Sequence, residues 1–207
     1  AQESHQVGSN VYGAVDISDN VVVGALSHGS VIYATPLCFY FSDCSNVIIT
    51  DEVFPSDNDT SFGLDVAADG NMFAVVSSHS LYVFNQTTSL LFAEVAKVDN
   101  TTGPLAMSEN LIVVGSRVLR TLDHGLTWSQ VLDMNTTCRA VDIEVDTVVC
   151  GEVSTALVFR TLDGGDTWVH IATLAPWGAI DDSFGSSVGF SGDLAVVGAE
   201  GAAFLFD

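Results

Sequence analysis

The sequence is short of positive charge, and it has no long apolar stretch. Five Lys and Arg residues stand against 26 Asp and Glu residues, which gives a formal net charge of −21. Nucleic acid is excluded as a partner because the chain would repel a phosphate backbone. An anionic membrane surface is disfavoured for the same reason. No apolar run approaches the roughly 20 residues that a membrane-spanning helix requires, so we expect no membrane insertion.

Apolar residues are nevertheless abundant. They make up 48% of the 207 residues, and the mean hydropathy is +0.40. They occur in many short runs of Val, Ala, Leu and Phe, a pattern that is typical of buried strands. Polar and glycine-rich turns interrupt these runs too often for an amphipathic helix. We therefore expect an all-β structure, of a length that suits one domain or one repeat array.

Several features favour a secreted or cell-surface glycoprotein. The chain begins Ala1-Gln2-Glu3 without a methionine, as expected of a mature terminus left by removal of a signal peptide. Four Asn-x-Ser/Thr sequons lie in polar stretches that resemble turns, and we expect N-linked glycans on their asparagines. These asparagines are Asn58, Asn85, Asn100 and Asn135.

The four cysteines point the same way, because disulfides persist in oxidising compartments. Four cysteines allow three pairings. Cys38 and Cys44 flank a short polar turn, and Cys138 and Cys150 flank a predicted hairpin. We expect the pairs Cys38–Cys44 and Cys138–Cys150, and free buried thiols are the alternative.

One sequence phrase recurs five times along the chain. It consists of a short alternating strand, a polar turn and an apolar run that ends in a small residue, as in Val15–Gly24 and Val141–Gly151. The closing small residues are at positions 24, 77, 115, 151 and 198. The spacing between successive positions is close to the roughly 40–50 residues of a four-stranded propeller blade. A third strand follows each phrase, and a fourth follows the first four. We therefore predict a five-bladed β-propeller of four-stranded antiparallel blades.

The fifth blade has only three strands of its own. An unpaired edge invites aggregation, and we predict that Gln2–Val7 supplies the missing strand. Pairing in cis closes the ring, whereas pairing in trans joins neighbouring chains by strand donation, and the sequence leaves both open. We expect one domain over residues 1–207, with blades at about 11–54, 61–98, 103–134, 138–175 and 183–207 plus 1–9.

The sequons fall on both sides of such a propeller. Asn58, Asn100 and Asn135 lie in predicted connections from a fourth strand to the next first strand, on the face that usually binds ligands. Asn85 is expected between a third and a fourth strand, on the opposite rim. Glycans on both sides favour a coated structural unit over an open active site.

Two stretches, Arg120–Trp128 and Arg160–Trp168, lie 40 residues apart and share the pattern Thr-x-Asp-x-Gly-x-Thr-Trp. They resemble the Asp-box (BNR) repeat, which implies a turn between the third and fourth strands of a blade. The aspartates are expected to accept hydrogen bonds from turn amides, the glycines to permit positive φ, and the tryptophans to be buried between blades. These structural residues are Thr121, Asp123, Gly125, Thr127 and Trp128, and Thr161, Asp163, Gly165, Thr167 and Trp168.

Ser183–Ala199 resembles the FG-GAP repeat of integrin-like propellers, and Ser61–Gly63 opens the second unit similarly. Many such repeats carry a calcium loop with the pattern Asp-x-Asp-x-Asp-Gly. Only the fragments Asp57–Asp59 and Asp181–Asp182 occur here, which leaves too few oxygen ligands in any one loop. We expect no cofactor and no metal site, with Ca²⁺ as the single candidate.

The Asp-box resemblance also suggests sialidases, which hold a substrate carboxylate with three arginines. Two of the four arginines here, Arg120 and Arg160, belong to the Asp-box strands instead. A glycosidase of the five-bladed kind needs two carboxylates at the central funnel. Glu152 and Glu200 follow second strands of adjacent blades and are the candidates, with solvated loop acids as the alternative. We expect no catalytic residue and no enzymatic activity.

The leading functional prediction is a non-enzymatic extracellular glycoprotein that acts as a structural or assembly module, such as a subunit of a filament or surface coat. Its expected partners are further copies of itself, or another extracellular protein or glycan. The alternative is a lectin-like propeller in which Tyr12, Tyr33 and Trp177 stack on sugars, although we expect these rings in the core. The candidates for a ligand-binding face are His28, His79, Arg117, Glu152, Trp177 and Glu200. The two histidines occupy matching turns and are expected to be turn residues rather than metal ligands.

Overall fold

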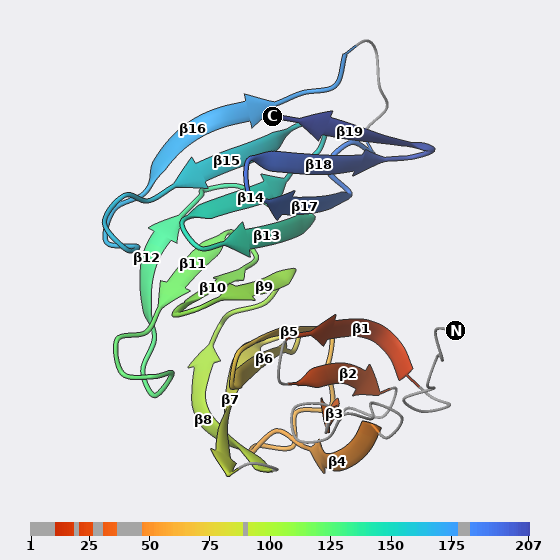
Figure 1. Ribbon diagram of the computed structural model, residues 1–207, viewed down its shortest axis with the longest axis vertical. Helices are drawn as coiled ribbons and strands as arrows, with labels where there is room; N and C mark the ends of the chain where they lie inside the picture. Colours follow the sequence, from red (N-terminus) through yellow and green to blue (C-terminus); the bar gives the residue numbers. More distant parts are fainter. Residues whose placement is uncertain (1–10, 19–20, 27–30, 37–46, 89–90, 178–182) are drawn as a thin grey trace. The chain divides into compact units, whose positions relative to one another are not determined.

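The computed structural model describes residues 11–18, 21–26, 31–36, 47–88, 91–177 and 183–207. The regular elements among them are β-strands, which form five antiparallel sheets (Figure 1). In every sheet, each strand pairs with its neighbours in the sequence. The described part contains no helix with the length and hydropathy to span a membrane. The prediction of an all-β structure with four-stranded antiparallel sheets is confirmed.

The described residues fall into two compact units, which meet in the sequence between Thr101 and Thr102. The single domain predicted over residues 1–207 stays a prediction. The first unit holds two sheets, with strand orders β1-β2-β3-β4 and β5-β6-β7-β8. Their strands are β1 (Val11–Ile17), β2 (Val22–Leu26), β3 (Val31–Pro36), β4 (Val47–Val53), β5 (Asp65–Asp69), β6 (Met72–Val76), β7 (Ser80–Thr88) and β8 (Leu91–Asp99).

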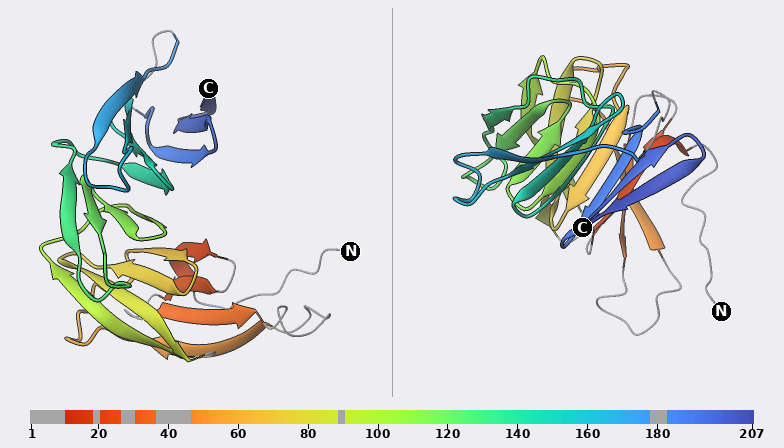
Figure 2. Two further views of the ribbon diagram at one scale, coloured as in Figure 1. Left: turned by 60° about the vertical axis from the view of Figure 1, so that its left-hand side comes forward. Right: turned by 90° about the horizontal axis from the view of Figure 1, so that it is seen from above.

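The second unit holds three sheets, with strand orders β9-β10-β11-β12, β13-β14-β15-β16 and β17-β18-β19 (Figure 2). The last of them has three strands among the described residues. The strands are β9 (Leu105–Ser108), β10 (Leu111–Val114), β11 (Arg117–Arg120), β12 (Ser129–Asp133), β13 (Ala140–Glu144), β14 (Thr147–Gly151), β15 (Ala156–Arg160), β16 (Val169–Leu174), β17 (Ser187–Ser191), β18 (Leu194–Ala199) and β19 (Ala202–Phe206).

Each unit has its own core. In the first unit the rings of Phe73 and Phe84 stack with centroids 4.8 Å apart, and Phe62 meets Tyr82 edge-on at 5.2 Å. In the second unit Phe184 meets Phe204 edge-on at 5.5 Å, and every residue of the strands β10 and β14 is buried. Burial on both faces explains why these strands read as continuous apolar runs rather than as alternating ones.

Each four-stranded sheet has a break in register between its third and fourth strands. Such a bulge bends the strand and increases its right-handed twist, which curves the outer part of the sheet. The breaks occur at Tyr33/Ala34, Val83/Phe84, Val118/Leu119 and Val158/Phe159.

Aspartates on the first strands tie neighbouring sheets together. Asp16 accepts a hydrogen bond from the Ala68 amide at 2.8 Å, and Asp142 accepts one from the Phe190 amide at 2.6 Å. Each aspartate also accepts from the amide of the isoleucine that follows it. The tripeptide Val-Asp-Ile occurs at both places and is the sequence signal for this arrangement. The role of its aspartate depends on contacts with residues about 50 positions away in the chain.

Candidate functional site

Two turns of the second unit share one hydrogen-bond pattern, and they connect β11 to β12 and β15 to β16. In the later turn, Thr161 Oγ1 donates to Asp163 Oδ1 at 2.8 Å and accepts from the Gly165 amide at 2.9 Å. Asp163 also accepts from the amide and the hydroxyl of Thr167, at 2.8 and 2.6 Å. The earlier turn repeats these bonds through Thr121, Asp123, Gly125 and Thr127.

These bonds hold both aspartates in the charged form. The Thr167 hydroxyl contributes most to lowering the pKa of Asp163, from its ordinary value of 3.8 to about 2. The pKa of Asp123 is also lowered, chiefly by the Thr127 hydroxyl. A carboxylate that stays charged is a dependable acceptor, so each turn is fixed by its own residues.

The tryptophans that close the two turns are half-buried. Trp128 and Trp168 each donate the indole N–H to a carbonyl of their own turn, on Gly125 at 2.9 Å and on Gly165 at 3.3 Å. This bond ties the polar edge of each ring to the turn. The Trp168 ring still packs against the core between the sheets β9–β12 and β13–β16.

Arg120, at the end of β11, fastens the later turn to the neighbouring sheet. Its Nη1 donates to the Gly164 carbonyl at 2.8 Å, and its Nη2 lies 2.7 Å from Asp166 Oδ1. The side chain of Arg120 is only 11% exposed. Gly165 makes the close approach possible, because its φ is +96° and a Cβ there would lie 3.1 Å from Arg120 Cδ. A guanidinium that binds two acceptors fixes position as well as charge.

Arg160 occupies the corresponding place in the next sheet, and no turn covers it among the described residues. It ends β15 opposite Thr147, as Arg120 ends β11 opposite Leu111. Its Nε donates to Thr147 Oγ1 at 2.9 Å and lies 3.8 Å from Asp146 Oδ1. Neither Nη group has a hydrogen-bond partner within the described part of the chain. The side chain is 38% exposed, so its two outer donors are available to a ligand.

Two cavities of the second unit border β19. One of about 360 Å³ lies between the sheets β13–β16 and β17–β19, and Arg160 lines it. The other, of about 440 Å³, shares part of its lining with the first. Within the described ranges β19 pairs only with β18. We call this region the β19 groove, and define it by Arg160, Ile171, Leu174, Trp177, Phe204 and Phe206.

A polar cavity of about 490 Å³ lies in the first unit around Lys97. Lys97 Nζ is 2.9 Å from Asp57 Oδ2 and 2.8 Å from Asp99 Oδ1, and these contacts contribute most to lowering the pKa of both carboxyls. The Tyr82 hydroxyl donates to Asp57 Oδ1 at 2.9 Å, and burial raises the pKa of Tyr82. The pKa of Asp59 falls to about 2, chiefly through the Ser61 hydroxyl.

The ammonium group of Lys97 pairs with Asp57, one of the two aspartates of the Asp57–Asp59 fragment on which the calcium hypothesis rests. A cation at Asp57 would have to displace Lys97. The described ranges contain no group of three or more His, Cys, Asp or Glu arranged to hold a metal. The other candidate fragment, Asp181–Asp182, lies outside the described residues.

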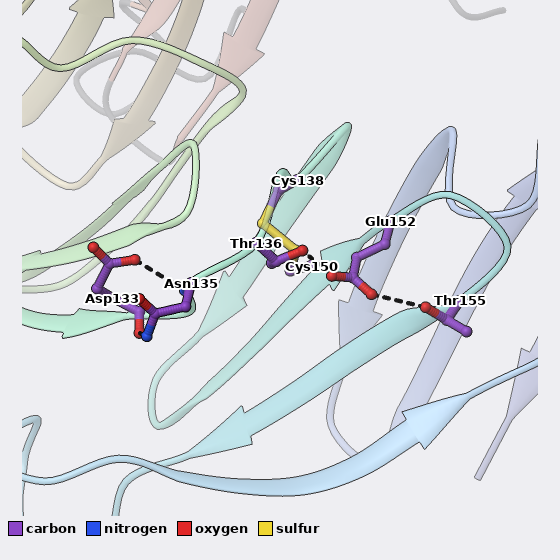
Figure 3. Close-up of a disulfide and its surroundings, with 7 residues drawn as sticks. All are labelled: Asp133, Asn135, Thr136, Cys138, Cys150, Glu152 and Thr155. Carbon is purple, nitrogen blue, oxygen red and sulfur yellow. Dashed lines mark hydrogen bonds between the residues drawn. A yellow bond between two sulfur atoms is a disulfide. The ribbon is translucent and has the colours of Figure 1, made fainter.

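Glu152, a candidate glycosidase carboxylate, is held by two threonines (Figure 3). Thr136 Oγ1 donates to its Oε1, and Thr155 Oγ1 donates to its Oε2 at 2.9 Å. Glu200, the other candidate, is exposed after β18, and its backbone amide donates to Ser183 Oγ at 2.6 Å. These contacts do not test the glycosidase alternative, which stays a prediction.

A disulfide joins Cys138 to Cys150 beside Glu152 (Figure 3), with a Cα–Cα distance of 5.4 Å. This is the pairing that the sequence favoured for these two residues, and it links the start of β13 to β14. Cys38 and Cys44 lie outside the described residues, so their pairing stays a prediction.

Three sequon asparagines lie in exposed turns. Asn58, Asn100 and Asn135 have φ of 57°, 55° and 53°, and they lie between β4 and β5, β8 and β9, and β12 and β13. Asn85 differs, because it lies inside β7 opposite Met72 and Ala93. Its predicted place between a third and a fourth strand is therefore wrong. The hairpin extends further than the sequence suggested because Phe92 of β8 is buried against Phe73.

Among the remaining residues predicted for a ligand-binding face, His79 and Arg117 lie in the described ranges, in different compact units. His79 is exposed, with Nδ1 2.7 Å from Ser78 Oγ, and Arg117 begins β11 opposite Asp133. His28 and the side chains of Tyr12 and Tyr33 lie outside the described part.

Trp177 is 92% exposed, so its predicted core position is wrong. It lies after Leu174, which ends β16 and is the last residue of that strand to pair with β15. The ring borders the β19 groove instead.

The β19 groove itself was not found by sequence reasoning. The signal lay in the repeat alignment, where Arg120 and Arg160 end the third strands of their sheets and Phe206 ends the third strand of the last sheet. Only the structure shows that the side chain of Arg120 is covered and that of Arg160 is exposed.

Comparison with protein families supports part of the sequence interpretation. Residues 168–205 match the model of the FG-GAP repeat, a region that runs from the start of β16 into β19. The resemblance of Ser183–Ala199 to this repeat is thereby confirmed. Comparison with curated protein sequences gives no match.

Solved structures with propeller-like folds are similar to the chain. The computationally designed protein Ika8 aligns with a TM-score of 0.66 at 17% identity over 96% of this chain and 58% of its own. Sqt1 of Saccharomyces cerevisiae aligns with a TM-score of 0.68 at 9% identity over 95% of this chain and 59% of its own. The N-terminal domain of Nup159 gives 0.51 at 14% identity, over 92% and 53%. The chain thus spans less than two thirds of each, and the likeness shows the fold alone.

Proposed function

We propose that the chain is a non-enzymatic extracellular structural module that assembles by accepting a β-strand at the outer edge of β19. The observation that supports this most directly is that β19, among the described residues, is paired on one edge only and lies beside an apolar groove. A free edge presents backbone N–H and C=O groups that bind an added strand, and pockets beside it accept alternate side chains of that strand.

The exposure of apolar side chains near β19 supports the same proposal. Leu205 is 65% exposed and Ile171 is 49% exposed. An added strand would cover these side chains, and each square ångström of apolar surface removed from water favours binding by about 25 cal/mol. Burial of this surface gives the added strand a source of affinity beyond its backbone hydrogen bonds.

The extracellular location rests on separate features. The Cys138–Cys150 disulfide is suited to an oxidising compartment. Asn58, Asn100 and Asn135 are exposed, as glycan acceptors must be. Asn135 Nδ2 donates to the Asp133 carbonyl at 3.2 Å, and a glycan on this nitrogen would still leave one N–H for that bond. The FG-GAP match also favours a protein of the cell surface.

The turns at residues 121–128 and 161–168 fit the proposal as structural parts. Their internal hydrogen bonds support the Asp-box interpretation, and the bonds of Asp123 and Asp163 remain within each turn. We assign them no ligand.

Strand acceptance is tested with synthetic peptides that correspond to the chain's own fourth strands, residues 47–53, 91–99, 129–133 and 169–174. At least one should protect the β19 amides from hydrogen exchange in the full chain. Leu205→Lys should abolish the protection, because a charge on an edge strand opposes pairing. Leu162→Lys, on a turn residue that is 92% exposed, is the matched control and should change nothing. Binding without protection of β19, or no binding to the folded chain, refutes the proposal.

The strand donor predicted from the sequence, residues 1–9, lies outside the described residues. Deletion of these residues tests it. If they occupy the edge in cis, the deletion should expose the β19 amides to exchange, and if they act in trans, it should abolish self-association in negative-stain micrographs.

A lectin is the second candidate function, and the exposure of Trp177 favours it. Exposed indole rings stack on sugar faces, and this one borders a cavity of about 440 Å³ together with Phe204. A glycan array should then show saturable binding that Trp177→Ala removes. Unchanged binding by that variant would place any sugar site elsewhere.

A further inference from the structure

The turn that leads from β4 to β5 carries the sequon asparagine Asn58 and is fastened to the strand β8. Lys97 Nζ of β8 lies 2.9 Å from Asp57 Oδ2 of the turn. The strand β8 ends two residues after Lys97, and the sequon asparagine Asn100 follows it directly. Two of the four predicted glycan acceptors of the chain are therefore found beside the same ion pair of the first unit.

Asn100 forms part of the wall of the polar cavity of about 490 Å³ in the first unit, which we call the Lys97 cavity. Its volume is within the range of about 300–1,000 Å³ that is usual for small-molecule sites, whose walls are mostly apolar. The described residues that line the Lys97 cavity are all polar, a wall that disfavours an apolar ligand and favours one rich in hydroxyl groups. These residues are Asp57, Asp59, His79, Ser80, Lys97, Asp99 and Asn100.

The groups in this wall suit the hydroxyl and acetamide groups of an N-linked sugar. Carboxylates accept hydrogen bonds, an ammonium group donates them, and a hydroxyl or a neutral imidazole does both. A sugar hydroxyl also donates and accepts, so it can bond to either kind of group. The ion pairs that Lys97 makes with Asp57 and Asp99 already balance part of the charge, so a neutral ligand can enter without displacing them.

A glycan on Asn100 would be attached covalently to the wall of the cavity. Such a tether gives its first sugars a local concentration of the order of millimolar, so hydrogen bonds too weak to capture a free sugar suffice. Asn58 is exposed, and among the described residues it does not line the cavity, although its neighbours Asp57 and Asp59 do. Asn100 is therefore the acceptor whose sugars the cavity favours.

We infer that the first N-acetylglucosamine units of an N-linked glycan on Asn100 occupy the Lys97 cavity. These sugars join the turn before β5 to the end of β8, so they form a structural part of the first unit. The inference goes beyond the proposed function, because it uses the extracellular location and does not depend on strand acceptance at β19.

Asn135 provides a reference within the same chain. It lies in the corresponding connection of the second unit, between β12 and β13, and is exposed. In the described ranges it lines none of the three cavities given above, and its Nδ2 donates to the Asp133 carbonyl at 3.2 Å. A glycan on Asn135 is therefore expected to extend into water, whereas one on Asn100 is expected to be shielded.

The shielding is measured on the intact chain secreted from mammalian cells. Peptide-N-glycosidase removes glycans under native conditions, and glycopeptide mass spectrometry follows each site. Release from Asn100 should be about tenfold slower than release from Asn135, because the sugars must first leave the cavity, and the two rates should agree after denaturation. His79→Ala removes an exposed side chain from the wall and should bring the Asn100 rate toward that of Asn135. His170→Ala, on an exposed histidine of β16, is the matched control and should change neither rate.

Hydrogen exchange tests the contact from the side of the protein. Thr102→Ala abolishes the sequon of Asn100, whereas Thr102→Ser keeps it. The glycosylated serine variant should exchange the amides of residues 57–61 about tenfold more slowly than the alanine variant. The same two variants made in the bacterial periplasm carry no N-glycan and should exchange alike, which controls for the hydroxyl. Thr137→Ala and Thr137→Ser, which do the same for Asn135, should not differ at these amides.

Three results would overturn the inference. They are an unoccupied Asn100 in the secreted chain, equal release from Asn100 and Asn135, and protection of residues 57–61 that Thr60→Ala removes and Thr102→Ala does not. The last of these would assign the cavity to a glycan on Asn58. None of them bears on the protection of β19 amides by added peptides, so strand acceptance would stand. Failure of that protection alone would equally leave this inference standing.

Discussion

Arg120 and Arg160 stand at corresponding ends of β11 and β15, in sheets that carry the same turn sequence. A turn covers Arg120 and leaves it 11% exposed, whereas Arg160 is 38% exposed and, within the described part of the chain, bonds only to Thr147 and Asp146 of its own sheet. The hydrogen bonds inside the two turns are nevertheless the same. The repeat motif determines each turn, and the next sheet determines whether the arginine beneath it is covered.

The comparison also separates contacts within a sheet from contacts between sheets. The Thr-Asp-Gly-Thr network spans a few residues, so any chain with this motif can form it. The bond from Arg120 to Gly164 spans 44 residues and requires two sheets packed together. Three predictions compare the sheets β9–β12 and β13–β16. In each, a substitution in one sheet is measured against the corresponding feature of the other.

The largest expected effect concerns the disulfide, which the sheet β13–β16 has and the sheet β9–β12 lacks. Replacement of Cys138 and Cys150 by serine should lower the free energy of unfolding by about 3 kcal/mol, because a closed loop of this length restricts the unfolded chain. Urea unfolding under non-reducing conditions measures the loss. Replacement of the same two cysteines by alanine should lower the free energy of unfolding by a similar amount. If only the serine variant is destabilised, the buried hydroxyls and not the missing disulfide are the cause.

A smaller effect is expected from the arginines themselves. Arg120→Gln removes a mostly buried charge that binds a carbonyl and a carboxylate, and it should cost about 2 kcal/mol of unfolding free energy. Arg160→Gln should cost less than about 0.5 kcal/mol, since exposed ion pairs contribute little. Equal losses in urea unfolding would mean that the two sites do not differ.

The smallest effect is one of pH. The pKa of Asp163 is lowered from 3.8 to about 2, so the stability that its charge confers is complete above about pH 4 and is lost as the pH falls toward 2. Asp163→Asn should therefore reduce the fall in Tm over this interval, and Asp123→Asn should act in the same direction. Thermal melts at intervals of half a pH unit measure it. A steeper fall in either variant would contradict the assignment.

Much of the fold could be predicted from the sequence because its signals are local. Alternating or continuous apolar runs gave the strands, and polar turns gave their ends. Cys138 and Cys150 face each other across one predicted hairpin, so a short loop sufficed to pair them. The turn residues Thr161 to Thr167 bond to one another, and their spacing alone indicated the arrangement.

What the sequence did not reveal depends on distant neighbours. Trp177 was expected in the core, but nothing in its own segment showed that no strand would cover it. Asn85 was placed in a turn because the burial of Phe92 against Phe73, which lengthens the hairpin, involves a strand earlier in the chain. The open state of Arg160 likewise depends on a sheet whose outer strand is not among the described residues.

The aspartates on the first strands would bear mechanical load if a partner pulled on β19. Tension would enter the sheet β17–β19 and pass to the sheet β13–β16 at its innermost strands. There Asp142 accepts from the Phe190 amide and Glu144 accepts from the Gly192 amide, each at 2.6 Å. Two bonds to charged acceptors would share the load in parallel with the apolar contacts. The joint between the sheets is therefore reinforced at the first strands β13 and β17, whereas the force arrives at the third strand β19.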